Sequence, residues 1–124
     1  MASADPLIAV VDDESPVRIM LGRVLRLADY RVNAFASGEE FLASLTAALP
    51  VCAIIDVHMP GISGLDVQAR MRATRIEVPV VFITASDDRA LDRLALESGA
   101  VGLLRKPFSS DELLETVAAA LLRK

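Results

Sequence analysis

Residues 53–61 read "AIIDVHMPG" and combine a strand-like apolar run with a charged end. The apolar run of residues 51–55 leads directly into the carboxylate of Asp56. The chain's only histidine, His58, and the turn-forming pair Pro60-Gly61 follow within five residues. A carboxylate beside a buried apolar run is unfavourable unless it has a partner. This stretch therefore predicts a central strand that delivers Asp56 to a functional position before the chain turns away.

Four further apolar runs of strand length occur along the chain. The complete set is LIAVV at residues 7–11, YRVNAFA at 30–36, VCAII at 51–55, VPVVFITA at 78–85 and VGLL at 101–104. Uninterrupted apolar runs are typical of parallel strands covered on both faces, whereas alternation is typical of an edge strand. The runs predict a parallel sheet with residues 30–36 at one edge.

Helix signals separate these runs. Ser15 followed by Pro16 predicts an N-cap with proline at the first helical position. Residues 37–40 and 109–112 both match the capping box Ser-x-x-Glu. Strands that alternate with helices predict an α/β fold, here a doubly wound parallel sheet of five strand–helix units that forms one domain over residues 1–124.

The bulk composition narrows the function classes. The net charge is −4 with a pI near 4.9, which argues against nucleic-acid binding by this domain alone. No apolar run is long enough to cross a bilayer, and the N-terminus lacks the basic start of a signal peptide, so a cytoplasmic location is expected. The single Cys52 lies in an apolar run and is expected to be a core residue.

Polar residues follow the carboxyl ends of the predicted strands. The set comprises Asp12, Asp13 and Glu14 after the first run, Asp56 after the third, Thr84 and Ser86 at the end of the fourth, and Lys106 after the fifth. In an open parallel α/β sheet the functional crevice lies beyond these ends. If the fold is right, carboxylates, a hydroxyl and an ammonium converge on one rim.

This combination is suited to phosphoryl chemistry with a hard cation. Adjacent carboxylates repel one another unless a cation neutralises them, and an all-oxygen donor set favours Mg²⁺. A carboxylate can attack phosphorus to give an aspartyl phosphate, while Mg²⁺, a lysine and a hydroxyl share the charge on the transferring group. Taken singly, Asp12-Asp13 would also fit a helix N-cap and Lys106 a solvated surface charge.

Together these residues closely resemble the receiver domain of two-component response regulators, the CheY-like family. The motifs are VVDDE, IIDVHMPGISG, VFITAS and GAVGLLRKPF, in that order and over essentially the whole chain. Each motif is weak alone, and the four in sequence are highly specific. The resemblance implies a flavodoxin-like, five-stranded parallel sheet of order 2-1-3-4-5 between five helices. It also implies a cis peptide between Lys106 and Pro107.

The resemblance implies a role for each site residue. Asp56 matches the phosphoacceptor, which receives its phosphoryl group from a histidine kinase or a phosphotransfer protein. Asp12 and Asp13 match the acidic pair, with Asp13 as the expected direct Mg²⁺ ligand and the His58 backbone carbonyl as another. Thr84 matches the hydroxyl that moves to the phosphoryl group, and Lys106 the lysine that contacts its oxygen.

The switching residues depart from the family pattern at one position. The family usually carries an aromatic residue three positions before the lysine, and this chain has Leu103 there. The phosphorylated form is expected to regulate an output domain or target protein through the fourth helix, the fifth strand and the fifth helix, from residue 87 onward. A phosphorylation-dependent dimer is a further expectation.

Two other functions use some of the same residues. A Mg²⁺-dependent phosphohydrolase would use Asp56 as nucleophile, but His58 stands where the usual Asp-x-Asp acid partner would be. A receiver-like scaffold that is never phosphorylated would be expected if one of the site residues were missing, but all the site residues are present. The sequence therefore predicts a phosphoacceptor that assists only its own phosphotransfer and dephosphorylation, and not an enzyme.

Overall fold

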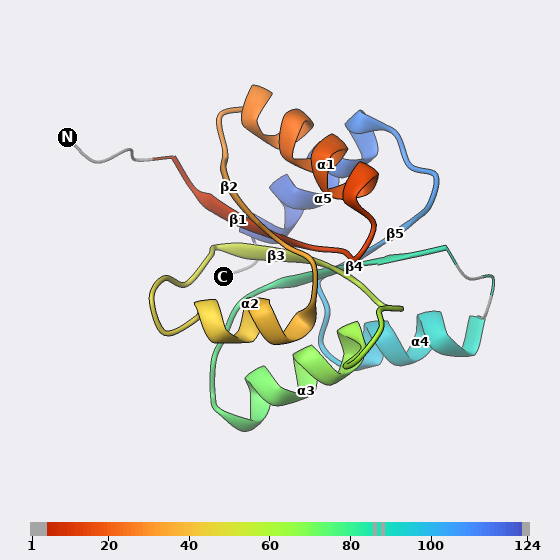
Figure 1. The fold of residues 1–124 in the computed structure, drawn as a ribbon. Helices are drawn as coiled ribbons and strands as arrows, with labels where there is room; N and C mark the ends of the chain where they lie inside the picture. The colour runs from red at the N-terminus through yellow and green to blue at the C-terminus, as the bar shows by residue number, and fades with distance from the viewer. Residues whose placement is uncertain (1–4, 86, 88, 123–124) are drawn as a thin grey trace.

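The computed structural model describes residues 5–85, 87 and 89–122, and Figure 1 shows a central sheet between two layers of helices. The strands are β1 (Leu7–Val11), β2 (Arg31–Phe35), β3 (Cys52–Asp56), β4 (Val80–Thr84) and β5 (Gly102–Arg105). All neighbouring pairs are parallel, and the order is β2-β1-β3-β4-β5. The predicted doubly wound sheet and its strand order are confirmed.

One helix follows each strand. The helices are α1 (Ser15–Leu27), α2 (Gly38–Ser44), α3 (Gly64–Ala73), α4 (Arg89–Glu97) and α5 (Ser110–Leu122). Helices α1 and α5 cover one face of the sheet, and α2, α3 and α4 cover the other (Figure 1). None of the helices within the described residues is long and apolar enough to span a membrane.

The strand sequences explain these two layers. In β3, Ala53 and Ile55 face the α2–α3–α4 layer, while Cys52 and Ile54 face the α1–α5 layer, and all four are buried. The uninterrupted apolar strands β1, β3 and β4 are buried along their whole length, whereas the alternating β2 is half exposed at the edge. The expected core position of Cys52 is confirmed, and its burial raises the pKa of the thiol to about 12.

The strand register shows which strand ends lie next to one another at the edge of the sheet. Val11 is the register partner of Ile55, Asp56 of Ile83 and Thr84 of Arg105. The carboxyl ends of four adjacent strands therefore lie at the same edge of the sheet. Residues at or just after these ends are neighbours in space although up to 94 positions separate them in sequence, as between Asp12 and Lys106.

The predicted helix starts are correct in part. Ser109 and Glu112 form the full capping box, because each backbone N–H donates to the other residue's side chain, at 3.2 and 3.0 Å. Ser37 caps α2 by accepting from the Glu40 N–H, but its hydroxyl also donates to the Glu40 carboxylate, so the reciprocal backbone bond is absent from this pair.

The predicted N-cap of the first helix was wrong by one residue. Ser15 already has helical geometry, and the N-cap is Glu14, whose side chain makes no capping hydrogen bond. The reason is that the Glu14 carbonyl oxygen already accepts the N–H groups of Val17 and Arg18, both at 3.1 Å. The Lys106–Pro107 peptide is cis, as the resemblance implied. Ser86, the last residue of the VFITAS motif, lies outside the described residues.

Candidate functional site

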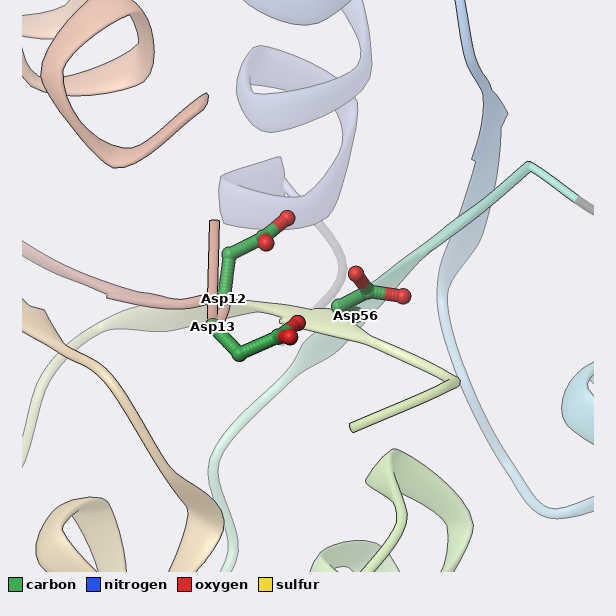
Figure 2. Close-up of side chains that lie close together, drawn as sticks. All are labelled: Asp12, Asp13 and Asp56. Atoms are coloured by element: carbon green, nitrogen blue, oxygen red, sulfur yellow. The ribbon is translucent and has the colours of Figure 1, made fainter. Parts of the chain in front are cut away.

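Three carboxylates meet at the rim of the sheet. Asp12 and Asp13 follow β1, Asp56 ends β3, and ligand oxygens of the three lie within 4.8 Å of one another (Figure 2). The Asp12 and Asp56 side chains are buried, and Asp13 is exposed. Together with Lys106 these residues form what we call the acidic site.

The backbone around Asp56 holds the end of β3 in place. The Val57 N–H donates to the Ile83 carbonyl oxygen at 2.9 Å, and the chain then returns so that the Gly64 N–H donates to the Val57 carbonyl oxygen at 2.9 Å. The His58 N–H donates to Asp56 Oδ1 at 3.0 Å, which fixes the carboxylate from its own loop. The Pro60-Gly61 turn thus brings the start of α3 back against the strand end.

Gly64 packs directly against the backbone of Asp56, so a side chain there should disturb the site. An added Cβ would lie 2.5 Å from the Asp56 carbonyl oxygen and 3.0 Å from Val57 Cα. Because these are backbone atoms, Gly64→Ala is expected to lower the free energy of unfolding by about 1–3 kcal/mol. Chemical denaturation measures this change.

Gly22 provides the matched control for that substitution. The atoms nearest to its added Cβ belong to the end of the flexible Arg26 side chain inside α1, the closest at 3.0 Å. Gly22→Ala should therefore raise the free energy of unfolding by about 0.5–1 kcal/mol. Equal effects of the two substitutions would contradict the close approach of Gly64 to β3.

Lys106 connects the acidic site to β5. Its Nζ donates to Glu14 Oε1 at 2.8 Å and to Asp56 Oδ2 at 3.2 Å, and it lies 3.2 Å from Asp12 Oδ2. The Lys106 N–H donates to the Thr84 carbonyl oxygen at 2.8 Å, which ties the lysine to the end of β4. The ammonium therefore faces three carboxylates from one position.

Negative charge exceeds positive charge at the acidic site. Burial and the nearby Asp12 charge raise the pKa of Asp56 to about 6 from its usual 3.8, although the His58 N–H and Lys106 act in the opposite direction. The carboxylates raise the pKa of Lys106 above its usual value despite its burial, and Lys106 lowers that of the exposed Glu14. One ammonium thus does not compensate the negative charge around Asp56.

This imbalance predicts that the protein becomes less stable as Asp56 ionises. Between pH 4 and 6 the unfolded chain releases this proton while the folded chain retains it, so the free energy of unfolding falls as pH rises through that range. Asp56→Asn should therefore raise the free energy of unfolding by about 1–3 kcal/mol at pH 7.5 in EDTA.

Urea denaturation of both proteins across this pH range measures the effect. The stabilisation should shrink toward zero near pH 4, where the wild-type carboxyl is also protonated. Lys106 keeps Glu14 and Asp12 as partners in the variant, so the lysine adds little to the difference. A variant less stable than the wild type at pH 7.5 would show that Asp56 is adequately compensated.

The acidic site fits a hard divalent cation. Asp12 Oδ2 is buried and accepts no hydrogen bond, although the Lys106 ammonium lies 3.2 Å away, so it retains the capacity to accept a ligand contact. The donor set consists of carboxylate oxygens from Asp12, Asp13 and Asp56, which is the chemistry that Mg²⁺ prefers. A cation would also offset the repulsion that raises the pKa of Asp56.

Of the other predicted residues, Thr84 and His58 lie at or next to this rim, whereas Leu103 lies inside β5. Thr84 is buried at the end of β4, and His58 follows β3 with an exposed side chain. His58 contacts Asp56 through its backbone N–H, and the role of its carbonyl as a ligand stays a prediction. Leu103 is partly buried in β5 and packs against the core beneath the α2–α3–α4 layer.

Comparisons with known proteins agree with the geometry. The sequence model of the response regulator receiver domain matches residues 8–118. Nodulation protein W of Bradyrhizobium diazoefficiens is 38% identical over 122 residues, 98% of this chain and 54% of that protein. The response regulator protein TodT of Pseudomonas putida is 34% identical over 121 residues, 98% of this chain and 53% of that protein. The chain spans about half the length of these relatives.

Solved structures give the same result for the fold. The crystal structure of FixJ-N superposes with a TM-score of 0.90 at 29% identity and covers 98% of both chains. The chemotaxis response regulator CheY4 of Vibrio cholerae superposes with a TM-score of 0.85 at 31% identity, over 95% of this chain and 100% of that chain. The chain therefore belongs to the response regulator receiver domain family, the regulatory modules of two-component systems.

Proposed function

We propose that this receiver domain is a phosphorylation-operated switch that accepts a phosphoryl group on Asp56. The observation that carries the proposal is the position of the Asp56 carboxylate, 3.2 Å from Lys106 Nζ and beside the Asp12 and Asp13 carboxylates. The Asp56 side chain is buried at the end of β3, and the neighbouring Asp13 is exposed, so we propose that the phosphodonor approaches from the side of Asp13. The phosphodonor would be a histidine kinase or a phosphotransfer protein, as the family resemblance implies.

The transfer step needs a nucleophile and compensation of charge. An oxygen of the ionised Asp56 carboxylate attacks phosphorus, a P–O bond forms, and the P–N bond to the donor histidine breaks as its nitrogen leaves with the bonding electron pair. The Lys106 ammonium is placed to share the charge on a phosphoryl oxygen. We assign the Thr84 hydroxyl to another of these oxygens, because Thr84 ends the adjacent strand.

Asp12, Asp13, Asp56 and the His58 carbonyl would hold Mg²⁺ in this proposal, with Asp13 as a direct ligand. When bound, Mg²⁺ supplies positive charge for the phosphoryl oxygens and offsets carboxylate repulsion. Asp12 is held in place by its own loop, since its Oδ1 accepts the Glu14 N–H at 2.9 Å. The chain would assist only its own phosphorylation and dephosphorylation.

The switch is proposed to act on the surface formed by α4, β5 and α5. Phosphorylation would draw Thr84 and Lys106 toward Asp56, and Lys106 directly follows β5. Within α4 only Ala95 is buried among the described residues, so few core contacts resist its movement. Leu103 packs in the core on the same side as Ala95, and we propose that it reports the change by packing in place of an aromatic ring.

The proposed partners follow from the relatives. TodT is a response regulator protein, and FixJ of Bradyrhizobium diazoefficiens is a transcriptional regulatory protein that is 33% identical over 114 residues, 56% of its length. We propose that the α4–β5–α5 surface of this domain controls an output domain or a target protein, with phosphorylation-dependent dimerisation as one route. With its net charge of −4, the domain itself is not proposed to bind nucleic acid or membranes, and a cytoplasmic location is expected.

Incubation with acetyl phosphate and Mg²⁺ tests the function. Intact-mass spectrometry should show one added phosphoryl group, and hydroxylamine should remove it because an acyl phosphate is the product. Peptide mapping should place the group on Asp56. Absence of incorporation with Mg²⁺ and any small phosphodonor would favour the unphosphorylated scaffold, and turnover of unrelated phosphomonoesters would favour a phosphohydrolase.

A further inference from the structure

A cation on α1 holds the peptide that joins the first two carboxylates of the acidic site. Arg18 Nη1 donates a hydrogen bond to the Asp12 carbonyl oxygen at 2.6 Å, and this oxygen belongs to the peptide unit between Asp12 and Asp13. The Asp12 N–H donates to the Phe35 carbonyl oxygen at 3.1 Å, and Asp12 Oδ1 accepts from the Glu14 N–H. Asp12 is therefore fixed on both sides, and Arg18 supplies the contact on the side of Asp13.

The orientation of Asp13 depends on this peptide. Its exposed carboxylate makes no hydrogen bond or ion pair with any residue that the structure describes, whereas Lys106 contacts Asp12, Glu14 and Asp56. Its ligand oxygen nevertheless lies within 4.8 Å of those of Asp12 and Asp56. Because no such contact holds this carboxylate, the backbone sets the direction of its Cα–Cβ bond and the rotamers open to it. The peptide that Arg18 holds thus sets where the Asp13 carboxylate reaches.

Helix stability does not account for an arginine at this position. Arg18 is the fourth residue of α1, and a cation in the first turn is unfavourable beside the positive end of the helix dipole. The first turn contains no acidic residue to offset it, and the N-cap residue Glu14 makes no side-chain capping bond. Arg18 is partly buried, and its guanidinium contacts the loop before the helix, so the contact serves that loop.

We propose that Arg18 is a positioning residue for the divalent cation, acting through the Asp12–Asp13 peptide. This inference rests on the proposed function, since the orientation of Asp13 matters to a cation at the acidic site. Contacts that orient metal ligands typically change metal affinity by about 10- to 100-fold when they are removed. The positive charge of Arg18 acts in the opposite direction, because it repels a divalent cation. Loss of the positioning contact would therefore raise the Mg²⁺ dissociation constant when Arg18 is removed, whereas loss of the positive charge would lower it.

Titration with Mg²⁺ alone, followed by backbone amide NMR shifts, tests this proposal without a phosphodonor. For Arg18→Met we expect the Mg²⁺ dissociation constant to rise about tenfold. The matched control is Arg23→Met, which removes the same charge from an exposed position on the same helix and should change the constant less than about twofold. Arg18→Lys retains a charged donor and should recover part of the affinity.

The outcomes separate this inference from the proposed function. Unchanged or tighter Mg²⁺ binding by Arg18→Met would overturn the positioning role and leave the proposed function intact. Absence of Mg²⁺ binding by the wild type would overturn both. If Arg18→Met does not fold, Arg18→Gln is the second variant and is expected to give the same two results, since it also removes the charge and shortens the side chain. In the variants that fold, the midpoint of thermal unfolding in EDTA should change little. If the role of Arg18 were purely structural, its removal would lower this midpoint and leave the Mg²⁺ dissociation constant unchanged.

Discussion

Asp56→Asn is expected to lower phosphoryl incorporation from acetyl phosphate and Mg²⁺ by at least about 100-fold, because a neutral amide oxygen is a poor nucleophile toward phosphorus. Intact-mass spectrometry over a time course measures the loss. The variant should be folded, and the relief of carboxylate repulsion should make it more stable than the wild type at neutral pH. Loss of incorporation in a more stable protein would separate chemistry from folding.

The control for this prediction is an aspartate away from the rim. Asp111 is exposed in the first turn of α5, and Asp111→Asn removes the same charge without touching the acidic site. It should incorporate phosphate at the wild-type rate. Incorporation by Asp56→Asn at a rate comparable to that of Asp111→Asn would place the acceptor on another residue.

Lys106→Met is expected to destabilise the protein by about 2–4 kcal/mol at pH 7.5 in EDTA, because it leaves buried carboxylates without their ammonium. Asp12 and Asp56 are both buried and lie 3.2 Å from Lys106 Nζ. Mg²⁺ should stabilise this variant more than the wild type, since the cation replaces the missing charge. Urea denaturation with and without Mg²⁺ gives both values.

A double-mutant cycle checks the cause. In the Asp56→Asn background Lys106→Met should cost at least about 1 kcal/mol less, because one of the carboxylates that needs the ammonium is gone. Equal costs of Lys106→Met in the two backgrounds would mean that Lys106 stabilises the fold through Glu14 and Asp12 alone.

The sequence pattern predicted the sheet because each central strand is uninterrupted and apolar. Alternation in residues 30–36 correctly placed β2 at an edge, where it is only partly buried: Val32 packs against the α1–α5 side and Phe35 against the α2–α3–α4 side. Asp56 and Lys106 were found because strand ends in a parallel sheet converge at one edge. The strand order came from the family resemblance, since apolar runs carry no information about which strands are neighbours.

Other features depend on contacts that local patterns do not encode. The contact of Lys106 with Glu14 joins residues 92 positions apart, and a glutamate after two aspartates gave no sign of it. Gly64 is required by the backbone of Asp56, eight positions earlier, and sequence alone shows only a glycine near a helix start. The full capping box of Ser63 with Asp66 was missed because it uses aspartate where the pattern requires glutamate.

The chemical-shift response of the whole domain to beryllofluoride and Mg²⁺ tests the central claim most directly. Beryllofluoride mimics a phosphoryl group on a carboxylate. We predict amide shift changes at Asp56, Thr84 and Lys106 that extend across α4, β5 and α5. A spectrum that stays unchanged, or changes only beside Asp13 and Asp56 as with Mg²⁺ alone, would contradict a phosphorylation-operated switch.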